Sequence, residues 1–408
     1  MATTLTPEFI RAIPKTDLHL HLDGSLRLPT LIELAKQEKV ELPSNSEEGL
    51  RERVFKDTYA NLPEYLQGFA YTCAVMQNAE NVERIAYELA FDNIEEGVRY
   101  IEVRFAPQLH MHEGFSAEQV VRAACKGLDR AKRTHNQGEN VKNGEDIPFE
   151  FGIIVCALRF INPEFSHYYR RLFQVLSYSP DKSVQSTASF EAARIADRLA
   201  NEAGLPVVGF DLAGAEAGFP AGDHREAFRF AHRQFLKKTV HAGEAYGPES
   251  IFQALRDCYA NRIGHGTWLF AHEKIKDPSI VDREGYTRKL VEYIASERIT
   301  IEVNLTSNLQ TDPSISSVAQ HPLRQMLEHN LSVSICTENR LMSNTSVSRE
   351  MQLAVDELDL TPYHFRNMVL AGFKGSFFPG TYNEKRAYVR QVQQQYKALV
   401  AKHLPGQP

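Results

Sequence analysis

Eight short runs rich in apolar and β-branched residues recur along the chain, and most of them are separated by stretches with helical spacing. Apolar runs separated by helices are typical of parallel strands that are buried on both faces. Eight such units predict a (β/α)₈ barrel of the TIM type, a fold of roughly 250 residues before insertions. The predicted strands lie within residues 16–25, 99–107, 149–157, 207–212, 238–241, 262–265, 300–305 and 331–337.

A two-domain, doubly wound α/β protein is the alternative for a chain of 408 residues. It is disfavoured because no glycine-rich phosphate loop follows any predicted strand and no stretch has the composition of a domain linker. We therefore expect one barrel domain over residues 1–408, with extra helices after the first strand (45–93) and at the C-terminus. Two polar stretches, 135–146 and 176–189, are predicted to be surface loops.

The first predicted strand, Thr16 to Ser25, reads TDLHLHLDGS. Side chains alternate across a strand, so one face carries Asp17, His19, His21 and Asp23, while leucines occupy the other face. Two histidines two residues apart can bind one metal ion from the same side. A half-exposed strand with a wet face is the simpler interpretation of an HxH motif. That interpretation does not account for the two aspartates in the same phase.

Polar residues suited to metal binding or proton transfer follow five of the eight predicted strands. In a barrel of this kind the reactive groups lie at the carboxyl ends of the strands, so these residues are expected to meet. Neighbouring glycines would allow a ligand to approach closely. The residues are His19, His21 and Asp23; Asp211 with Gly214; His241 and Glu244; His265 between two glycines; and Glu338 with Asn339.

Three histidines (His19, His21 and His241) and one carboxylate are a plausible zinc shell with one position open to water. Zinc would lower the pKa of that water to about 7, and Glu244 could supply the proton that attack on an electron-poor carbon requires. Taken singly, His241 could be a core histidine, Glu244 a helix N-terminal carboxylate and His265 a satisfied barrel residue. Their joint position at strand ends favours a reactive site.

A second HxH pair, His110 and His112, follows Pro107 in polar sequence, and we expect it to lie in a solvated loop. The net charge of −6 has the same sign as nucleic acid and anionic lipid, so it does not indicate binding to either. Five scattered cysteines without CxxC spacing indicate reduced thiols. With no signal-like N-terminus and no apolar run long enough to span a membrane, a cytoplasmic protein is expected.

Five segments closely resemble the adenosine deaminase family of the zinc amidohydrolase superfamily. They are DLHLHLDGSL (17–26), GFDLAGAEAGFP (209–220), TVHAGEAYGPES (239–250), RIGHGT (262–267) and NLTSNLQT (304–311). The resemblance keeps its order from about residue 14 to 350, and HxHxDG combined with HAGE and GHG is far more specific than any one of these motifs. It implies a (β/α)₈ barrel that holds one Zn²⁺ per chain.

The resemblance also implies a role for each matching residue. His19, His21, His241 and Glu338 would bind the metal. Glu244 would protonate purine N1 as water adds to C6, and His265 would orient and activate that water. The substrate contacts would be His21, Asp23, Gly214 and Asn339, with Gly214 at purine N3, Asn339 at N7 and Asp23 at the ribose 5′-hydroxyl. Adenine-selective relatives generally have Glu in place of Asp23.

The chain departs from the family pattern at the eighth strand, where the family usually reads TDD or TDN and this chain reads Thr337-Glu338-Asn339. The carboxylate of Glu338 stands one methylene, on the order of 1.5 Å, further from the backbone, whereas Zn–O distances are held near 2.0–2.2 Å. The strand end must retract, the side chain must take another rotamer, or metal affinity is weakened. Ala215 also replaces an Asp that many members carry before the residue matching Glu216.

The sequence therefore predicts a zinc-dependent hydrolase that converts adenosine and 2′-deoxyadenosine to inosine or 2′-deoxyinosine and ammonia. Two alternatives remain at this point. One is a deaminase of adenine or of a modified adenosine, and the other is a catalytically weak ligand-binding relative whose zinc site is altered at Glu338. The expected partner is a small purine nucleoside, with no nucleic acid and no membrane.

Overall fold

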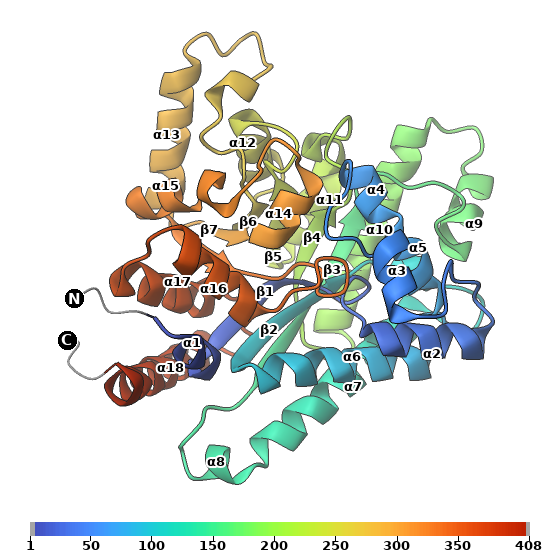
Figure 1. Cartoon of the computed structure of the whole chain (residues 1–408). Coiled ribbons are helices and arrows are strands. Elements are labelled where there is room, and N and C mark those ends of the chain that lie inside the picture. Colours follow the sequence, from blue (N-terminus) through green and yellow to red (C-terminus); the bar gives the residue numbers. More distant parts are fainter. Residues whose placement is uncertain (1–4, 405–408) are drawn as a thin grey trace.

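The computed structural model describes residues 5–404 and contains one sheet of eight strands in sequential order, β1-β2-β3-β4-β5-β6-β7-β8 (Figure 1). Every neighbouring pair is parallel. The predicted (β/α)₈ barrel is confirmed. The strands are β1 (Lys15–His21), β2 (Val98–Phe105), β3 (Glu150–Leu158), β4 (Val207–Ala213), β5 (Lys237–Ala242), β6 (Arg262–His265), β7 (Thr300–Val303) and β8 (Ser332–Ile335).

The chain beyond β8 closes the barrel against β1. The backbone N–H of Glu338 donates to the carbonyl of His19, and the N–H of His21 donates to the carbonyl of Glu338. Both N···O distances are 2.7 Å. Asp17 supports the same junction, because its carboxylate accepts the Thr337 N–H at 3.1 Å and the Thr337 hydroxyl at 2.5 Å. Asp17 is thus a structural link between the first strand and the chain that follows the last strand.

Helices follow each strand and cover the outside of the barrel (Figure 1). After β2 to β7 these are α7 (Ala117–Asn136), α8 (Glu139–Lys142), α9 (His167–Val175), α10 (Asp181–Asn201), α11 (Arg225–Arg233), α12 (Pro248–Asp257), α13 (Arg283–Ser296), α14 (Leu305–Thr311) and α15 (Leu323–Glu328). Short 3₁₀ turns are η1 (Pro107–Leu109), η2 (Ala221–His224), η3 (His272–Lys274) and η4 (Val318–Gln320).

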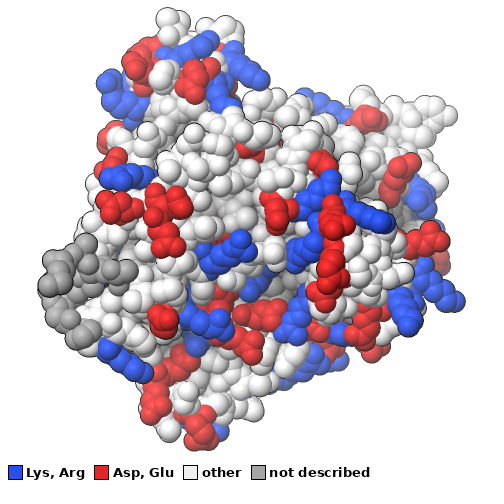
Figure 2. All heavy atoms as spheres, viewed as in Figure 1, with Lys and Arg blue, Asp and Glu red and all other residues white. Residues whose placement is uncertain are grey.

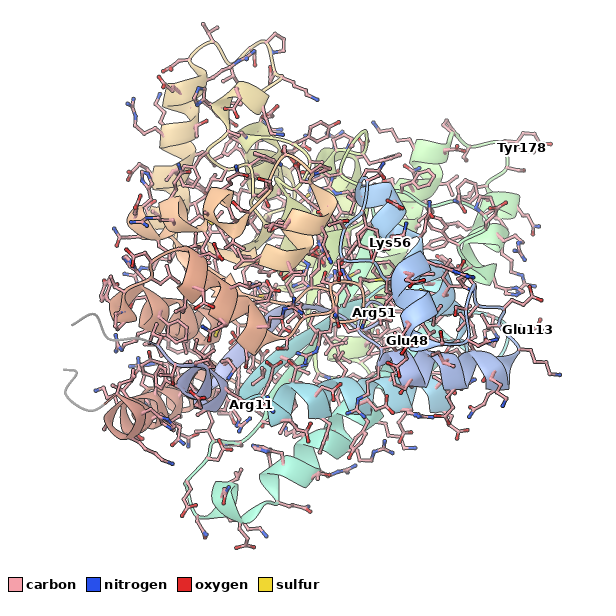
Figure 3. All side chains as sticks on the ribbon, viewed as in Figure 1. Arg11, Glu48, Arg51, Lys56, Glu113 and Tyr178 are labelled. Atoms are coloured by element: carbon pink, nitrogen blue, oxygen red, sulfur yellow. The ribbon has the colours of Figure 1, made fainter. Side chains whose placement is uncertain are left out.

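The predicted insertion after the first strand is present, and its middle part reaches the end of the barrel at which the strands have their carboxyl termini. It contains α2 (Leu28–Glu38), α3 (Glu47–Arg53), α4 (Leu62–Leu66), α5 (Gly68–Ala74) and α6 (Ala79–Glu95). Arg51 of α3, labelled in Figure 3, donates to the carbonyl of Leu341 at 2.9 Å. Tyr65 of α4 bonds the hydroxyl of Ser343 at 3.2 Å. These contacts join the insertion to the chain after β8.

The predicted C-terminal helices are α16 (Val347–Glu357), α17 (Pro362–Gly375) and α18 (Tyr382–His403), and α1 (Pro7–Ala12) packs against α16 and α18. Helix α17 crosses β8 and β1 closely at Gly372. A Cβ at that position would lie 2.1 Å from the Thr16 hydroxyl oxygen, so only glycine fits there.

In Figure 2 the acidic and basic side chains on the visible face are interspersed.

The two predicted polar loops are partly wrong. Residues 135–146 contain the end of α7 and the short helix α8, and α10 begins at Asp181, inside the stretch expected to be a loop. Val184, Ala188 and Ala192 are buried at helical spacing on α10, and this apolar face stabilises the helix. The many polar residues on its other face make the helical pattern hard to detect in the sequence. No helix within residues 5–404 is both long and apolar enough to cross a bilayer.

Candidate active site

Three histidine side chains meet inside the barrel at the ends of β1 and β5. His19 and His21 alternate on β1, and His241 lies on β5. Nε2 of His241 lies 3.0 Å from Nε2 of His19 and 3.2 Å from Nε2 of His21, and all three rings are buried. The structure thus brings together the three histidines that the sequence proposes as metal ligands.

Two of these rings face a buried carboxylate through their other nitrogen. His19 Nδ1 lies 2.9 Å from Glu302 Oε2, and His241 Nδ1 lies 3.2 Å from Asp211 Oδ1. Burial, together with the positive charge of Arg104, lowers the pKa of His19 well below its ordinary range. Since a carboxylate can only accept, each Nδ1 carries the ring proton and each Nε2 presents a lone pair. Two lone pairs 3.0 Å apart repel one another, so the donor set fits a cation held between them.

Glu338 supplies the carboxylate beside these histidines. One of its oxygens lies with the three histidine nitrogens in a group whose atoms are all within 4.8 Å of one another. The residue has φ 60°, in the left-handed region that disfavours side chains other than glycine. Its backbone is fixed to β1 on both sides by the hydrogen bonds that close the barrel. The longer side chain therefore reaches the cluster from a fixed backbone position that lies three residues beyond the end of β8.

Glu244 and His265 lie beside the same cluster, and the ring centroid of His265 is 5.0 Å from that of His19 and 5.2 Å from that of His241. One ligand atom each from Glu244, His265 and Glu338 falls within a second group, again within 4.8 Å, and His265 Nε2 is 3.9 Å from Glu244 Oε2. Burial raises the pKa of Glu244 well above its ordinary range, and the nearby carboxylates of Glu338 and Glu216 raise it further. A raised pKa favours the protonated form of this carboxyl, which can donate its proton.

A chain of hydrogen bonds determines which nitrogen of His265 carries the proton. The backbone N–H of Leu323 donates to His321 Nδ1 at 3.1 Å, so the proton of neutral His321 is on Nε2. That Nε2–H donates to Asn308 Oδ1 at 3.2 Å, and Asn308 Nδ2 then donates to His265 Nδ1 at 3.0 Å. Burial and nearby histidines lower the pKa of His265 well below its ordinary range. Neutral His265 therefore carries its proton on Nε2, the nitrogen that faces Glu244.

The family model described as Adenosine deaminase matches residues 14–395. The chain belongs to the adenosine deaminase family. It is 34% identical over 398 residues to Adenosine deaminase 1 of Streptomyces coelicolor (96% of this chain, 89% of the relative). It is also 34% identical over 407 residues to an adenosine deaminase of Mycolicibacterium vanbaalenii (98% and 100%). A Dictyostelium discoideum protein named "Probable adenosine deaminase" is 32% identical over 374 residues, which are 91% of this chain and 42% of that protein.

Solved structures share the fold at lower sequence identity. An adenine deaminase from Arthrobacter aurescens is 23% identical, with a TM-score of 0.71 and coverage of 95% of this chain and 100% of that one. The N6-mAMP deaminase of Arabidopsis is 24% identical, with a TM-score of 0.71 and coverage of 96% and 99%. An amidohydrolase from Burkholderia ambifaria with bound Zn is 19% identical, with a TM-score of 0.74 and coverage of 98% of each chain.

Gly214 and Asn339, which the sequence proposes as substrate contacts, follow β4 and β8 of the same barrel. Gly214 follows β4 with φ 93°, and a Cβ there would meet only a backbone nitrogen at 3.8 Å, so the conformation and not the space requires glycine. Asn339 donates from Nδ2 to the Tyr65 hydroxyl at 2.9 Å. Gly24 makes room for it, because a Cβ on Gly24 would lie 1.8 Å from Asn339 Oδ1. The β1 strand ends at His21, so Asp23 and Gly24, inside the predicted strand range 16–25, lie beyond the strand.

Glu216 fixes the loop that carries Glu244. Its carboxylate accepts the backbone N–H groups of four consecutive residues, Gly243 to Tyr246, at 2.7–3.1 Å, and it also accepts the hydroxyl of Ser250. The side chain lies after β4 and bonds the loop after β5. The Ala215 substitution noted in the sequence therefore leaves this anchor intact.

Asp211 could be named from the sequence, but the other buried charges behind the proposed metal-binding histidines could not. Arg104 Nη2 donates to Glu302 Oε2 at 2.9 Å, and Arg104 Nη1 donates to Asp211 Oδ2 at 3.0 Å. Glu302 also accepts from Arg262 Nε at 2.6 Å. These groups are fully buried. A charged residue within an apolar strand was the available signal, because such residues are seldom buried without a partner.

The expectation that His110 and His112 form a solvated pair is wrong for His110. His112 is partly exposed and bonds the carbonyl of Gln77 at 2.8 Å. His110 is fully buried, and burial lowers its pKa to about 4. The chain turns inward at η1, so a histidine in polar sequence is enclosed by the insertion after β1.

Proposed function

We propose that this chain is a zinc-dependent adenosine deaminase that hydrolyses adenosine and 2′-deoxyadenosine with release of ammonia. The observation that carries the proposal is the convergence of His19, His21, His241 and Glu338 beside the Glu244–His265 pair. This arrangement puts a metal-binding group, a proton donor and an N–H donor around one point, as hydrolytic deamination of a purine requires.

His19, His21, His241 and Glu338 would hold the metal. A donor set of imidazole nitrogens with one carboxylate suits zinc, and the Burkholderia ambifaria amidohydrolase of the same fold contains Zn. When bound, zinc would lower the pKa of a water to about 7 and so supply a nucleophile at neutral pH. Asp211 and Glu302 hold two of the rings in the tautomer that zinc binding needs.

Glu244 would give its proton to purine N1 as water adds to C6. The raised pKa of this buried carboxyl favours the protonated form that a proton donor needs. The carbonyl of Glu244 accepts the indole N–H of Trp268 at 2.9 Å, and Glu216 holds the backbone of the loop. These bonds restrict the positions that the acid can take, which favours proton transfer to one ring atom.

His265 would orient the attacking water by donating from Nε2. The hydrogen-bond chain from Leu323 through His321 and Asn308 keeps the proton on that nitrogen. A neutral N–H donor can hold a water oxygen in place and stabilise negative charge as it develops.

A nucleoside, and not a nucleotide or a free base, is the proposed substrate. Gly214 and Asn339 would contact the purine, while the buried carboxyl of Asp23 would accept a ribose 5′-hydroxyl. Asp23 lies close to Cys73 and His110. A 5′-phosphate placed beside the Asp23 carboxyl would meet an acidic group, which disfavours a nucleotide.

Ammonia release from a small panel tests the proposal. The panel contains adenosine, 2′-deoxyadenosine, adenine, AMP and N6-methyl-AMP, and Glu244→Gln prepared in parallel reports any contaminating deaminase. We expect kcat/KM for the two nucleosides to exceed that for the other compounds by at least about 100-fold. Preferential turnover of AMP, N6-methyl-AMP or adenine would overturn the substrate, and no ammonia from any compound would overturn the activity.

A further inference from the structure

Three residues that could bind metal meet beside the site already described. Asp23 follows β1, Cys73 lies on α5, and His110 ends η1. One ligand atom from each residue falls within a group whose members are all within 4.8 Å of one another. Asp23 and His110 are 3% and 0% exposed, and Cys73 is also buried.

Several polar atoms of this cluster lack a well-formed hydrogen bond to the residues that the structure describes. They are Asp23 Oδ1 and both ring nitrogens of His110, whose ring has only a weak contact with the backbone of Met76. A buried carboxyl and a buried imidazole without partners are unfavourable, and they persist in a folded protein mainly where a ligand satisfies them. Other histidines buried outside the site, such as His224 and His321, do have hydrogen-bond partners.

We propose that Asp23, Cys73 and His110 form a second metal site that takes Zn²⁺. A carboxylate oxygen, a thiolate sulfur and an imidazole nitrogen are all zinc ligands, and three of them leave one tetrahedral position for water. The thiolate selects against Mg²⁺ and Ca²⁺, which bind oxygen ligands. On binding, the zinc–sulfur bond replaces the S–H bond of Cys73, and the proton is released to solvent.

Hydrogen bonds hold the segments of Cys73 and His110 in place without the metal. Gln77 Nε2 donates to the carbonyl of Cys73 at 2.7 Å and to that of Leu109 at 3.4 Å, so one side chain joins the thiol segment to the residue before His110. The N–H of His110 donates to the carbonyl of Pro107 at 2.9 Å. A partly preformed site needs little rearrangement to bind an ion.

Occupation of the second site would inhibit the enzyme. Asp23 is the proposed contact for the ribose 5′-hydroxyl, so zinc on its carboxylate and a bound nucleoside would exclude one another. Zinc beyond one equivalent would then act as a competitive inhibitor of nucleoside turnover. This consequence rests on the proposed function, whereas the metal site itself does not.

Cobalt binding to the full-length holoenzyme tests the site independently of activity. A thiolate bound to Co²⁺ gives a charge-transfer band in the near ultraviolet. The ligands proposed for the first site include no sulfur, so this band would report Cys73. We expect Co²⁺ to bind with this band in the wild type, Cys73→Ser to lose the band and one equivalent of bound metal, and His110→Leu to lose the same equivalent. Cys125→Ser, which removes another buried thiol, should retain both.

The outcomes separate the second site from the proposed function. Absence of the band in the wild type would overturn the second site without reference to any variant, and so would a band that persists in folded Cys73→Ser. If Cys73→Ser folds poorly, His110→Leu provides the comparison. Loss of the second equivalent in both variants supports the site whether or not the protein releases ammonia. In an active preparation, we expect excess zinc to raise the apparent KM for adenosine at least tenfold in the wild type and not in Cys73→Ser.

Discussion

His321 donates from Nε2 to Asn308 Oδ1 at 3.2 Å, and through this bond a histidine outside the metal cluster sets the tautomer of His265. The direction is not ambiguous, because the backbone N–H of Leu323 occupies His321 Nδ1 and a backbone amide can only donate. Asn308 must then donate to His265 Nδ1. The NLTSNLQT segment therefore acts on the site through Asn308.

Asn308→Asp tests this chain of hydrogen bonds with almost no change in shape. A carboxylate cannot donate to His265 Nδ1, so it would draw the ring proton to that nitrogen and remove it from Nε2. We expect kcat to fall by about 10- to 100-fold with metal content unchanged. Nitrogen-15 shifts of His265 should show the proton moving from Nε2 to Nδ1. Asn201→Asp, at an exposed helix end, is the control. A wild-type kcat in Asn308→Asp would show that the tautomer does not matter.

Glu244→Gln removes the proposed proton donor and keeps the size of the side chain. We expect zinc to be retained and kcat to fall by about 10²- to 10⁴-fold, because an amide cannot protonate the purine ring. Glu273→Gln, on the exposed turn η3, should be unaffected. Turnover near that of the wild type in Glu244→Gln would refute the role of this residue.

Glu338 can be tested with two substitutions that separate charge from length. Glu338→Gln removes the negative charge, and we expect it to lower zinc affinity by about 10-fold or more, since a neutral carbonyl oxygen is a weaker ligand. Glu338→Asp keeps the charge and restores the residue that the family usually has, so it should retain the metal. Loss of zinc in Glu338→Asp, measured by competition with a chelator, would mean that this barrel depends on the longer side chain.

The buried His224 should make the free energy of unfolding decrease in acid. Burial, with the charge of Arg159, lowers its pKa from 6.5 to about 4 in the folded protein, and Ser189 Oγ lies 2.6 Å from its Nδ1. The unfolded chain therefore binds more protons between pH 6.5 and 4, and folding free energy is lost as the pH falls through this window. The loss from this residue is about 2 kcal/mol at pH 5. Urea unfolding of His224→Gln should show a correspondingly smaller change between pH 7 and pH 5; an equal change would contradict the assignment.

Much of the fold was predictable because a parallel barrel strand is buried on both faces. The apolar runs at residues 149–157 and 207–212 therefore mark β3 and β4 directly in the sequence. The start of α10 was not predictable in the same way. Its buried face consists of small residues such as Ala188 and Ala192 among serines and threonines, and the helix forms because that face packs against its neighbours.

The proposed reactive residues were predictable because they lie at or just beyond the ends of strands, and the ends of parallel strands meet at one rim. The residues that support them were not, since Glu302 and Arg104 act through pairing between strands far apart in sequence. The burial of His110 could not be predicted from the sequence either. Its local sequence is polar, and only the packing of the insertion after β1 encloses it.

Metal content measured together with activity tests the central claim most directly. Purified full-length protein should contain close to one tightly held zinc per chain and should release ammonia from adenosine. Removal of the metal by a chelator should abolish that release, and one equivalent of zinc should restore it. Protein that holds less than about a tenth of a zinc per chain and releases no ammonia from adenosine after zinc is added would contradict the account.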